Sequence, residues 1–268
     1  MIVNGYNLTP GADLPGAQLS DVWLIAAGLR DIKLDGASLS HSNLREIDLR
    51  GASLIRADLT AAHLSSAHLQ NSNFRMALLV GAILVNADLT DSHLANADLR
   101  GADLRRACLI RANLSNVNAL GADCSMADFS NTSLEHSRLQ DSSLHYVKMC
   151  RACLTGANFR NACLTSSDLT DSVLVGADLS GADLSNSYLV GADLSRANLS
   201  GANLSGANLK RAVVHEANFY RANLAGCCLS EAELWNSNLD GADLTDATLA
   251  GANLKNNTSR YTRGLYGR

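Results

Sequence analysis

Two cysteines three residues apart, Cys150 and Cys153, have the spacing of a metal-binding or redox motif. A structural zinc site needs about four converging ligands, and no second CxxC or paired histidines accompany this one. We therefore predict that the chain binds no metal and that its seven cysteines are free thiols. The repeat described below places Cys124 and Cys227 inside the protein and the other five cysteines outside.

The histidines and serines suggest no catalytic group. The seven histidines are scattered, and none has a fixed Asp or Cys companion of the kind that forms a triad. The serines mostly follow the repeat, which makes them turn or filler residues. The sequence also contains no P-loop, no GxGxxG and no HExxH motif. We predict a protein that is not an enzyme, with no cofactor and no small-molecule substrate.

A five-residue frame runs through the chain and must position every one of these side chains. Leucine occupies the same place, called i below, in 41 of 49 frames from Leu14 to Leu254, without insertion or deletion. Two residues earlier, 33 frames hold Ala, and no residue at either place is charged. A phase kept this long indicates one structural unit copied along the whole chain.

A period of five fits neither a helix, with 3.6 residues per turn, nor a continuous strand, with a period of two. Within one frame, however, i−2 and i lie on the same face of a short extended segment. The other three residues must turn the chain. Sixteen of the 20 glycines fall at i+2, where a turn favours positive φ. The pattern predicts short extended segments joined by corners, winding around a core of Leu and Ala.

The stretches GADLSGADLS (176–185) and SGANLSGANLK (200–210) resemble the pentapeptide repeat family, whose pattern is A(D/N)LxX. The resemblance covers residues 11–256. It implies an all-β fold, a right-handed quadrilateral parallel β-helix (a solenoid) of about 12 coils of 20 residues each. The residues alone do not give the four sides, because the sequence shows no clean period of twenty.

The two ends leave the repeat. A stacked solenoid exposes unpaired backbone and core at each end, so residues 1–10 are expected to form an N-terminal cap. For residues 257–268 two interpretations stay open: a cap, or a homodimer contact, since the resemblance implies that some relatives dimerise through this end.

No apolar run of 18 residues and no signal peptide is visible. We expect a bacterial protein in the cytoplasm, without membrane contact.

One group of outward positions departs from the polar character of the rest. The stretch 76–85 carries apolar side chains at outward places, with Ile55 one coil below and arginines one coil above. An exposed apolar patch with a charged rim is typical of a protein interface; the alternative is an ordinary sheet surface, because single exposed apolar residues are common. The candidate interface residues are Ile55, Met76, Leu78, Val80, Ile83, Val85, Arg100, Arg105 and Arg106.

Two functions follow from these observations. The first is a rigid, non-enzymatic scaffold that binds a protein partner through its outer faces. The alternative comes from the resemblance, which implies a DNA mimic that binds DNA gyrase and protects it from quinolones or toxins. Mimicry needs an acidic stripe in place of phosphates, yet the acidic residues here alternate with arginines and the net charge is only −4. Direct nucleic-acid binding is less favoured, because no aromatic stacking platform accompanies the arginines.

Overall fold

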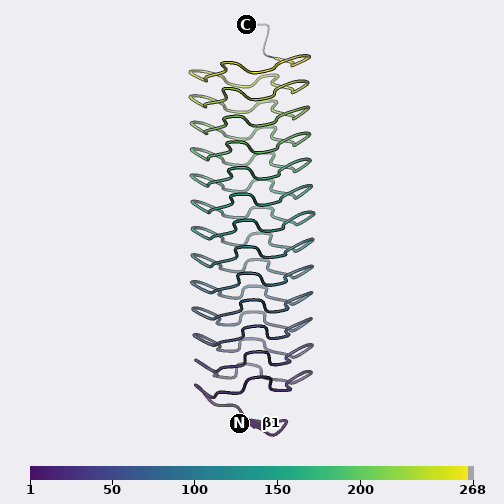
Figure 1. Cartoon of the computed structure of the whole chain (residues 1–268), viewed down its shortest axis with the longest axis vertical. Helices are drawn as coiled ribbons and strands as arrows, with labels where there is room; N and C mark the ends of the chain where they lie inside the picture. The colour runs from purple at the N-terminus through teal and green to yellow at the C-terminus, as the bar shows by residue number, and fades with distance from the viewer. Residues whose placement is uncertain (265–268) are drawn as a thin grey trace. The chain divides into compact units, whose positions relative to one another are not determined.

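The computed structural model describes residues 1–264 and shows a chain wound into stacked coils (Figure 1). Parallel β-bridges join residues that are 20 apart, as in Asp58↔Leu78 and Leu78↔Asp98. The bridges recur every five residues along each coil, always at i−1. Each coil therefore has 20 residues and four bridged segments, which confirms a parallel β-solenoid. The bridged segments are too short to count as strands.

Backbone hydrogen bonds hold neighbouring coils together in a constant pattern. The N–H of Leu79 donates to the carbonyl of Asp98 at 2.7 Å, and the N–H of Leu78 donates to the carbonyl of Ala57 at 2.9 Å. The same two bonds repeat from frame to frame within each compact unit. Because every coil uses them, the backbone is nearly identical from coil to coil. The differences between regions therefore arise from side chains.

The corners explain the placement of glycine. The residue at i+2 has positive φ in all 49 frames, from Gly16 to Asn256. The N–H at i+3 then donates to the carbonyl at i, as in Ala82 to Leu79 at 3.0 Å. This arrangement is a β-turn in which the third residue needs the left-handed region, where glycine and asparagine fit best. The predicted role of the glycines at i+2 is confirmed.

The predicted core is also confirmed. Nearly all residues at i and i−2 are buried, and Cys124 and Cys227 are buried among them. At several of the i−2 positions where serine replaces alanine, the hydroxyl bonds to the turn: Ser92 Oγ donates to the carbonyl of Leu89 at 2.6 Å. Ser42 Oγ donates instead to the carbonyl of Leu19 in the neighbouring coil, at 2.7 Å. A buried hydroxyl that makes such a bond costs little. The core therefore accepts most of these serines with their hydroxyls paired; Ser137 Oγ is the exception, since it is buried without a hydrogen-bond partner among the described residues.

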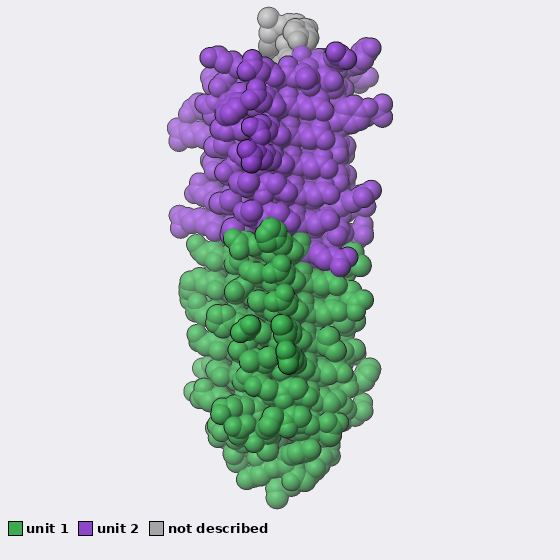
Figure 2. All heavy atoms as spheres, in the orientation of Figure 1, with its two compact units in different colours: residues 1–137 green, residues 138–268 purple. Residues whose placement is uncertain are grey.

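The chain divides into two compact units, Met1–Ser137 (unit 1, green in Figure 2) and Arg138–Arg268 (unit 2, purple). Unit 1 begins with the only two strands among residues 1–264: β1 (Ile2–Val3) and β2 (Tyr6–Asn7), an antiparallel hairpin. Leu8 follows it and is buried. The last four residues of the predicted C-terminal segment 257–268 lie outside the described residues. No helix long and apolar enough to cross a membrane occurs in residues 1–264.

Candidate protein-binding surface

Five of the apolar candidates lie on two adjacent sides of one coil in unit 1, and Ile55 lies one coil below them. Leu78 and Ile83 are bridging residues on consecutive segments, paired to Asp98 and Asp103 of the next coil. Met76 is the corner residue before Leu78. Residues 76–85 therefore form one strip across two consecutive sides of the coil. We call the six apolar candidates the belt: Ile55, Met76, Leu78, Val80, Ile83 and Val85.

The belt residues differ in how far they reach into solvent. Met76 is 43% exposed, Leu78 44% and Ile83 36%. The other three are half-buried. Ile55 lies at the edge of the belt, where its N–H is bound by Asp35 Oδ1 at 2.9 Å. The accessible apolar surface of the belt is thus concentrated on Met76, Leu78 and Ile83.

Two of the three candidate arginines are neutralised by carboxylates of their own frame. Arg100 pairs with Asp98, its Nη2 donating to Oδ2 at 2.7 Å, and Arg105 pairs with Asp103 at 2.6 Å in the same way. Both pairs use two guanidinium nitrogens, so each plane is fixed against its carboxylate. The hydrogen bond from Arg105 lowers the pKa of Asp103. The rim above the belt therefore carries less net charge than its arginines suggest.

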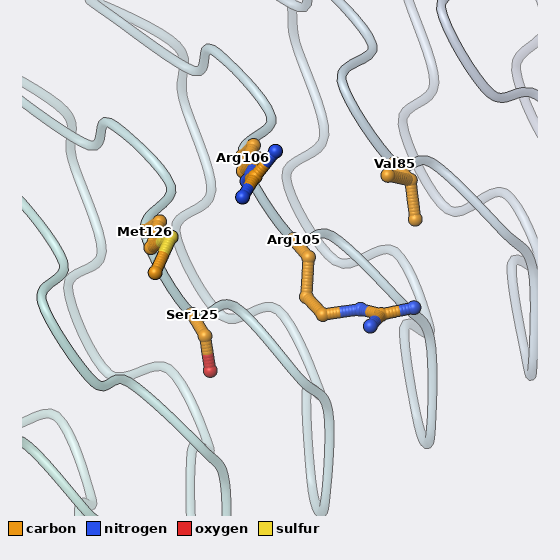
Figure 3. Close-up of a pocket in the computed structure, with 5 residues that line it drawn as sticks. All are labelled: Val85, Arg105, Arg106, Ser125 and Met126. Atoms are coloured by element: carbon orange, nitrogen blue, oxygen red, sulfur yellow. The ribbon is translucent and has the colours of Figure 1, made fainter.

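Arg106 behaves differently, because no ion pair holds it in the part of the chain that the structure describes. It lines a shallow hollow of about 400 Å3 together with Val85, Arg105, Ser125 and Met126. Figure 3 shows these five side chains, which come from three successive coils. Met126 is 52% exposed. Val85 belongs to both the belt and the hollow. The hollow therefore places the unpaired guanidinium of Arg106 next to the belt.

Met126 and the nearby Leu120 were missed by the sequence reasoning. Each stands 20 residues after a candidate, Met126 after Arg106 and Leu120 after Arg100, and Leu120 is 37% exposed. The coil period of 20 would have placed them directly above the arginines. The sequence hides that period, because Leu and Ala repeat every five residues on all sides alike.

One histidine adjoins the belt. His63 is bridged to Ile83 one coil away, and its Nε2 lies 2.9 Å from Ser65 Oγ. Partial burial, and next the positive charge of Arg45, lower the pKa of His63. Both causes favour the neutral ring. At neutral pH, therefore, the side chain below Ile83 adds no charge to this surface.

The structure brings one histidine against a cysteine, a neighbour that the sequence analysis did not identify. His145 Nδ1 lies 3.4 Å from Cys163 Sγ. The two residues are 18 apart, an offset that brings position i+1 of one coil against i−1 of the next. Arg30 and Asp48, at 2.6 Å, show the same offset. A search of the sequence for complementary residues 18 apart would have found the pair.

None of the seven cysteines forms a disulfide in the described structure. Burial raises the pKa of Cys227 to about 12 and raises that of Cys124 still further, so both thiols stay protonated. Among residues 1–264, no group of three or more His, Cys, Asp or Glu side chains is placed to hold a metal ion.

The comparisons with known proteins identify the family. The model described as "Pentapeptide repeats" matches eight times, together spanning most of residues 32–256. The matched ranges are 32–71, 42–79, 82–118, 107–145, 120–156, 152–189, 177–215 and 217–256. The chain therefore belongs to the pentapeptide repeat family, as the resemblance indicated. A search of curated protein sequences found no match.

Solved structures of the same family are similar to this chain. HetL, a pentapeptide repeat protein involved in heterocyst differentiation regulation in the cyanobacterium Nostoc sp., is 34% identical, with 81% of this chain and 86% of HetL covered and a TM-score of 0.34. The Nostoc pentapeptide repeat protein alr5209 is 36% identical over 40% of this chain and 84% of its own, with a TM-score of 0.24. A trypsin-treated QnrB1, a plasmid-mediated fluoroquinolone resistance protein, is 19% identical, covering 86% and 93%, with a TM-score of 0.42.

Proposed function

We propose that the protein is a rigid scaffold that binds a protein partner through the belt and the hollow beside it. The observation that carries the proposal is the strip formed by Met76, Leu78 and Ile83, three large apolar side chains exposed on adjacent sides of a single coil. Apolar area of this kind contributes roughly 25 cal/mol per Å2 when a partner covers it. The family's right-handed, four-sided coil gives such a surface a fixed shape.

The backbone at the corners supports a binding role. Met76 and Met126 occupy i+2 with φ of 59° and 64°, in the left-handed region. A side chain other than Gly, Asn or Asp at such a position costs on the order of 1 kcal/mol. Other corners carry the same cost with residues such as Ala61 and Glu46, so the methionines are distinguished by their apolar side chains, which remain about half exposed. Flexible methionines are well suited to fill irregular gaps in a partner surface.

The test is capture of partners by two variants of the purified protein. Leu78→Asn with Ile83→Asn removes the centre of the belt and keeps polar groups compatible with the bridging positions. Val173→Asn with Tyr188→Asn is the matched control, because these two bridging residues of unit 2 are also exposed, at 38% and 54%. We expect the belt variant to lose a captured protein that wild type and control both retain. Equal capture by all three proteins would contradict the proposal.

Gyrase binding by DNA mimicry has less support from the surface of unit 1. Asp98 and Asp103 are paired with arginines at 2.7 and 2.6 Å, and Asp91 is paired with Arg111. A carboxylate neutralised in this way does not substitute for a phosphate. If the alternative is correct, micromolar protein will change DNA supercoiling by gyrase in the presence of a quinolone, and the belt variant will do so equally.

A further inference from the structure

The Cys163 and His145 pair in unit 2 has a geometry that the scaffold function does not use. Cys163 Sγ lies 3.4 Å from His145 Nδ1, and the hydroxyl of Thr165 lies 2.6 Å from the same nitrogen. All three side chains are half-buried. A thiol beside an imidazole is the usual arrangement for activating a cysteine nucleophile, because the ring accepts the thiol proton.

The coil backbone fixes this arrangement. The N–H of Cys163 donates to the carbonyl of Ser142 at 3.0 Å, and the N–H of Leu144 donates to the carbonyl of Cys163 at 2.7 Å. His145 follows Leu144 directly. The N–H of Tyr146 then donates to the carbonyl of Thr165 at 3.0 Å. The thiol, the ring and the hydroxyl are thus held on two adjacent coils by consecutive backbone bonds.

Another outward thiol offers a comparison. Cys228 is the closest match to Cys163, because it also occupies i−1 and has a hydroxyl at i+1, with Sγ 3.6 Å from Ser230 Oγ. Eighteen residues before Cys228, in the place that His145 takes for Cys163, stands Lys210. Cys228 therefore reproduces the position and the hydroxyl of Cys163 without the histidine.

We propose that Cys163 is a site of modification by small disulfides, with His145 as the base. Cys163 Sγ attacks one sulfur of the disulfide, and its proton passes to His145 Nδ1. The new S–S bond forms as the old one breaks. The departing thiolate takes the proton from His145 and leaves as a thiol. One thiol and one disulfide are consumed and one of each is produced, so no further oxidant is needed.

The neighbouring coil sets the charge of the reagent. Asp183 is bridged to Cys163, and its Oδ1 accepts hydrogen bonds from the N–H of Ser185 at 3.0 Å and from Asn203 Nδ2 at 3.1 Å. No cation is paired with this carboxylate within residues 1–264. A negative charge beside the sulfur repels anionic reagents and attracts cationic ones. The preferred class is therefore a small cationic disulfide, for which cystamine is the probe.

The experiment compares the rates at which individual cysteines are modified. Reduced full-length protein is mixed with excess cystamine at pH 7, samples are quenched with acid, and each cysteine is followed by peptide mass spectrometry. We expect Cys163 to react about tenfold faster than Cys228, or more, because a positioned base typically contributes at least that factor. With oxidised glutathione, which is anionic, we expect a smaller ratio between the rates at Cys163 and Cys228.

Two variants separate the role of the base from simple exposure. His145→Gln keeps a polar side chain without a base, so the rate at Cys163 should fall to that of Cys228 while Cys228 is unchanged. Lys210→His places a histidine 18 residues before Cys228 and should raise the rate there. The proposal is overturned if Cys163 reacts no faster than Cys228, or if folded His145→Gln protein keeps the wild-type rate.

Discussion

The bridging positions of the two units carry different chemistry on the same backbone. In the belt of unit 1 these positions hold Leu78 and Ile83, which have no polar group to offer a neighbouring coil. In unit 2 a column of side chains bond to one another from coil to coil: Asn198 donates to Asp178 at 3.1 Å, and Asn218 donates to Asn198 at 3.1 Å. We call this column, with Asn238 above it, the amide ladder.

The amide ladder satisfies its own hydrogen bonds. The Oδ1 of Asn218 accepts from the Nδ2 of Asn238 at 3.0 Å and from the N–H of Tyr220 at 3.1 Å, while its own amide donates to Asn198. A carbonyl oxygen with two donors has both lone pairs occupied. Such a surface contributes to cohesion between coils and offers few acceptors to a partner. The belt does the reverse, because its apolar side chains gain most when something outside covers them.

Core substitutions test whether the difference is confined to the surface. Leu79 and Leu199 are both at position i and are 1% and 0% exposed. We expect Leu79→Ala and Leu199→Ala to lower the free energy of unfolding by similar amounts, about 2–5 kcal/mol each, through lost burial and a residual cavity. Urea unfolding of each variant gives the measurement. If one variant loses an amount of stability within this range and the other an amount outside it, the cores of the two units differ as well as their surfaces.

Removing one rung of the amide ladder should have the next largest effect. Asn218→Ala deletes the donor to Asn198 and the acceptor used by Asn238 and Tyr220. Because these groups are half-buried, we expect a loss of about 1–2 kcal/mol in the free energy of unfolding, near the value of one or two net hydrogen bonds. Hydrogen exchange should speed up in residues 198–238.

The matched control is Leu78→Ala in the belt, where no side-chain bond between coils is lost. Its cost should be smaller, because Leu78 is 44% exposed. If Asn218→Ala costs no more than Leu78→Ala, the amide ladder does not hold the coils together.

The fold could be predicted from the sequence because the repeat is a local pattern. Leu and Ala at i and i−2 fixed the inward face, and glycine at i+2 marked the corner with positive φ. The 20-residue coil could not be derived, since the inward residues look alike on all four sides. It is visible only in outward partners that are 18 or 20 apart, such as Arg30 with Asp48 and Asp91 with Arg111.

The candidate surface was predicted only in part for the same reason. Five of the six belt residues lie within two successive frames, 76–85, so their apolar character is readable along the chain. Met126 joins the hollow from two coils above Val85, which only the coil period reveals. Sequence also could not show that Arg100 and Arg105 are paired while Arg106 is not, because that depends on the rotamer each guanidinium adopts.

Converting the belt to the chemistry of the ladder should separate binding from stability. In Leu78→Asn the new amide stands between Asp58 and Asp98, its bridged neighbours. It can donate to Asp58 as Asn198 does to Asp178. We expect the free energy of unfolding to change by less than about 0.5 kcal/mol, as is usual for exposed positions. Partner capture should nevertheless weaken, which urea unfolding and capture on the same preparation would show. A large loss of stability would indicate that the belt serves cohesion instead.

The smallest expected effect is a pH dependence confined to the belt. The pKa of His63 is lowered in the folded protein by partial burial and by Arg45. As pH falls through the unfolded value near 6.5, the unfolded chain takes up a proton that folded His63 does not. The free energy of unfolding therefore declines as pH falls below that value, and the decline is complete once pH is below the pKa of His63 in the folded protein.

Hydrogen exchange between pH 7.5 and 5.5, corrected for the intrinsic rate, should show this loss of protection in the coils that contain His63 and Ile83. His63→Gln should abolish it there. The amide ladder is the internal reference, because asparagine does not titrate. An equal loss in residues 198–238 would mean that His63 is not the cause. Loss limited to the belt would show that its coils respond to pH separately from the ladder.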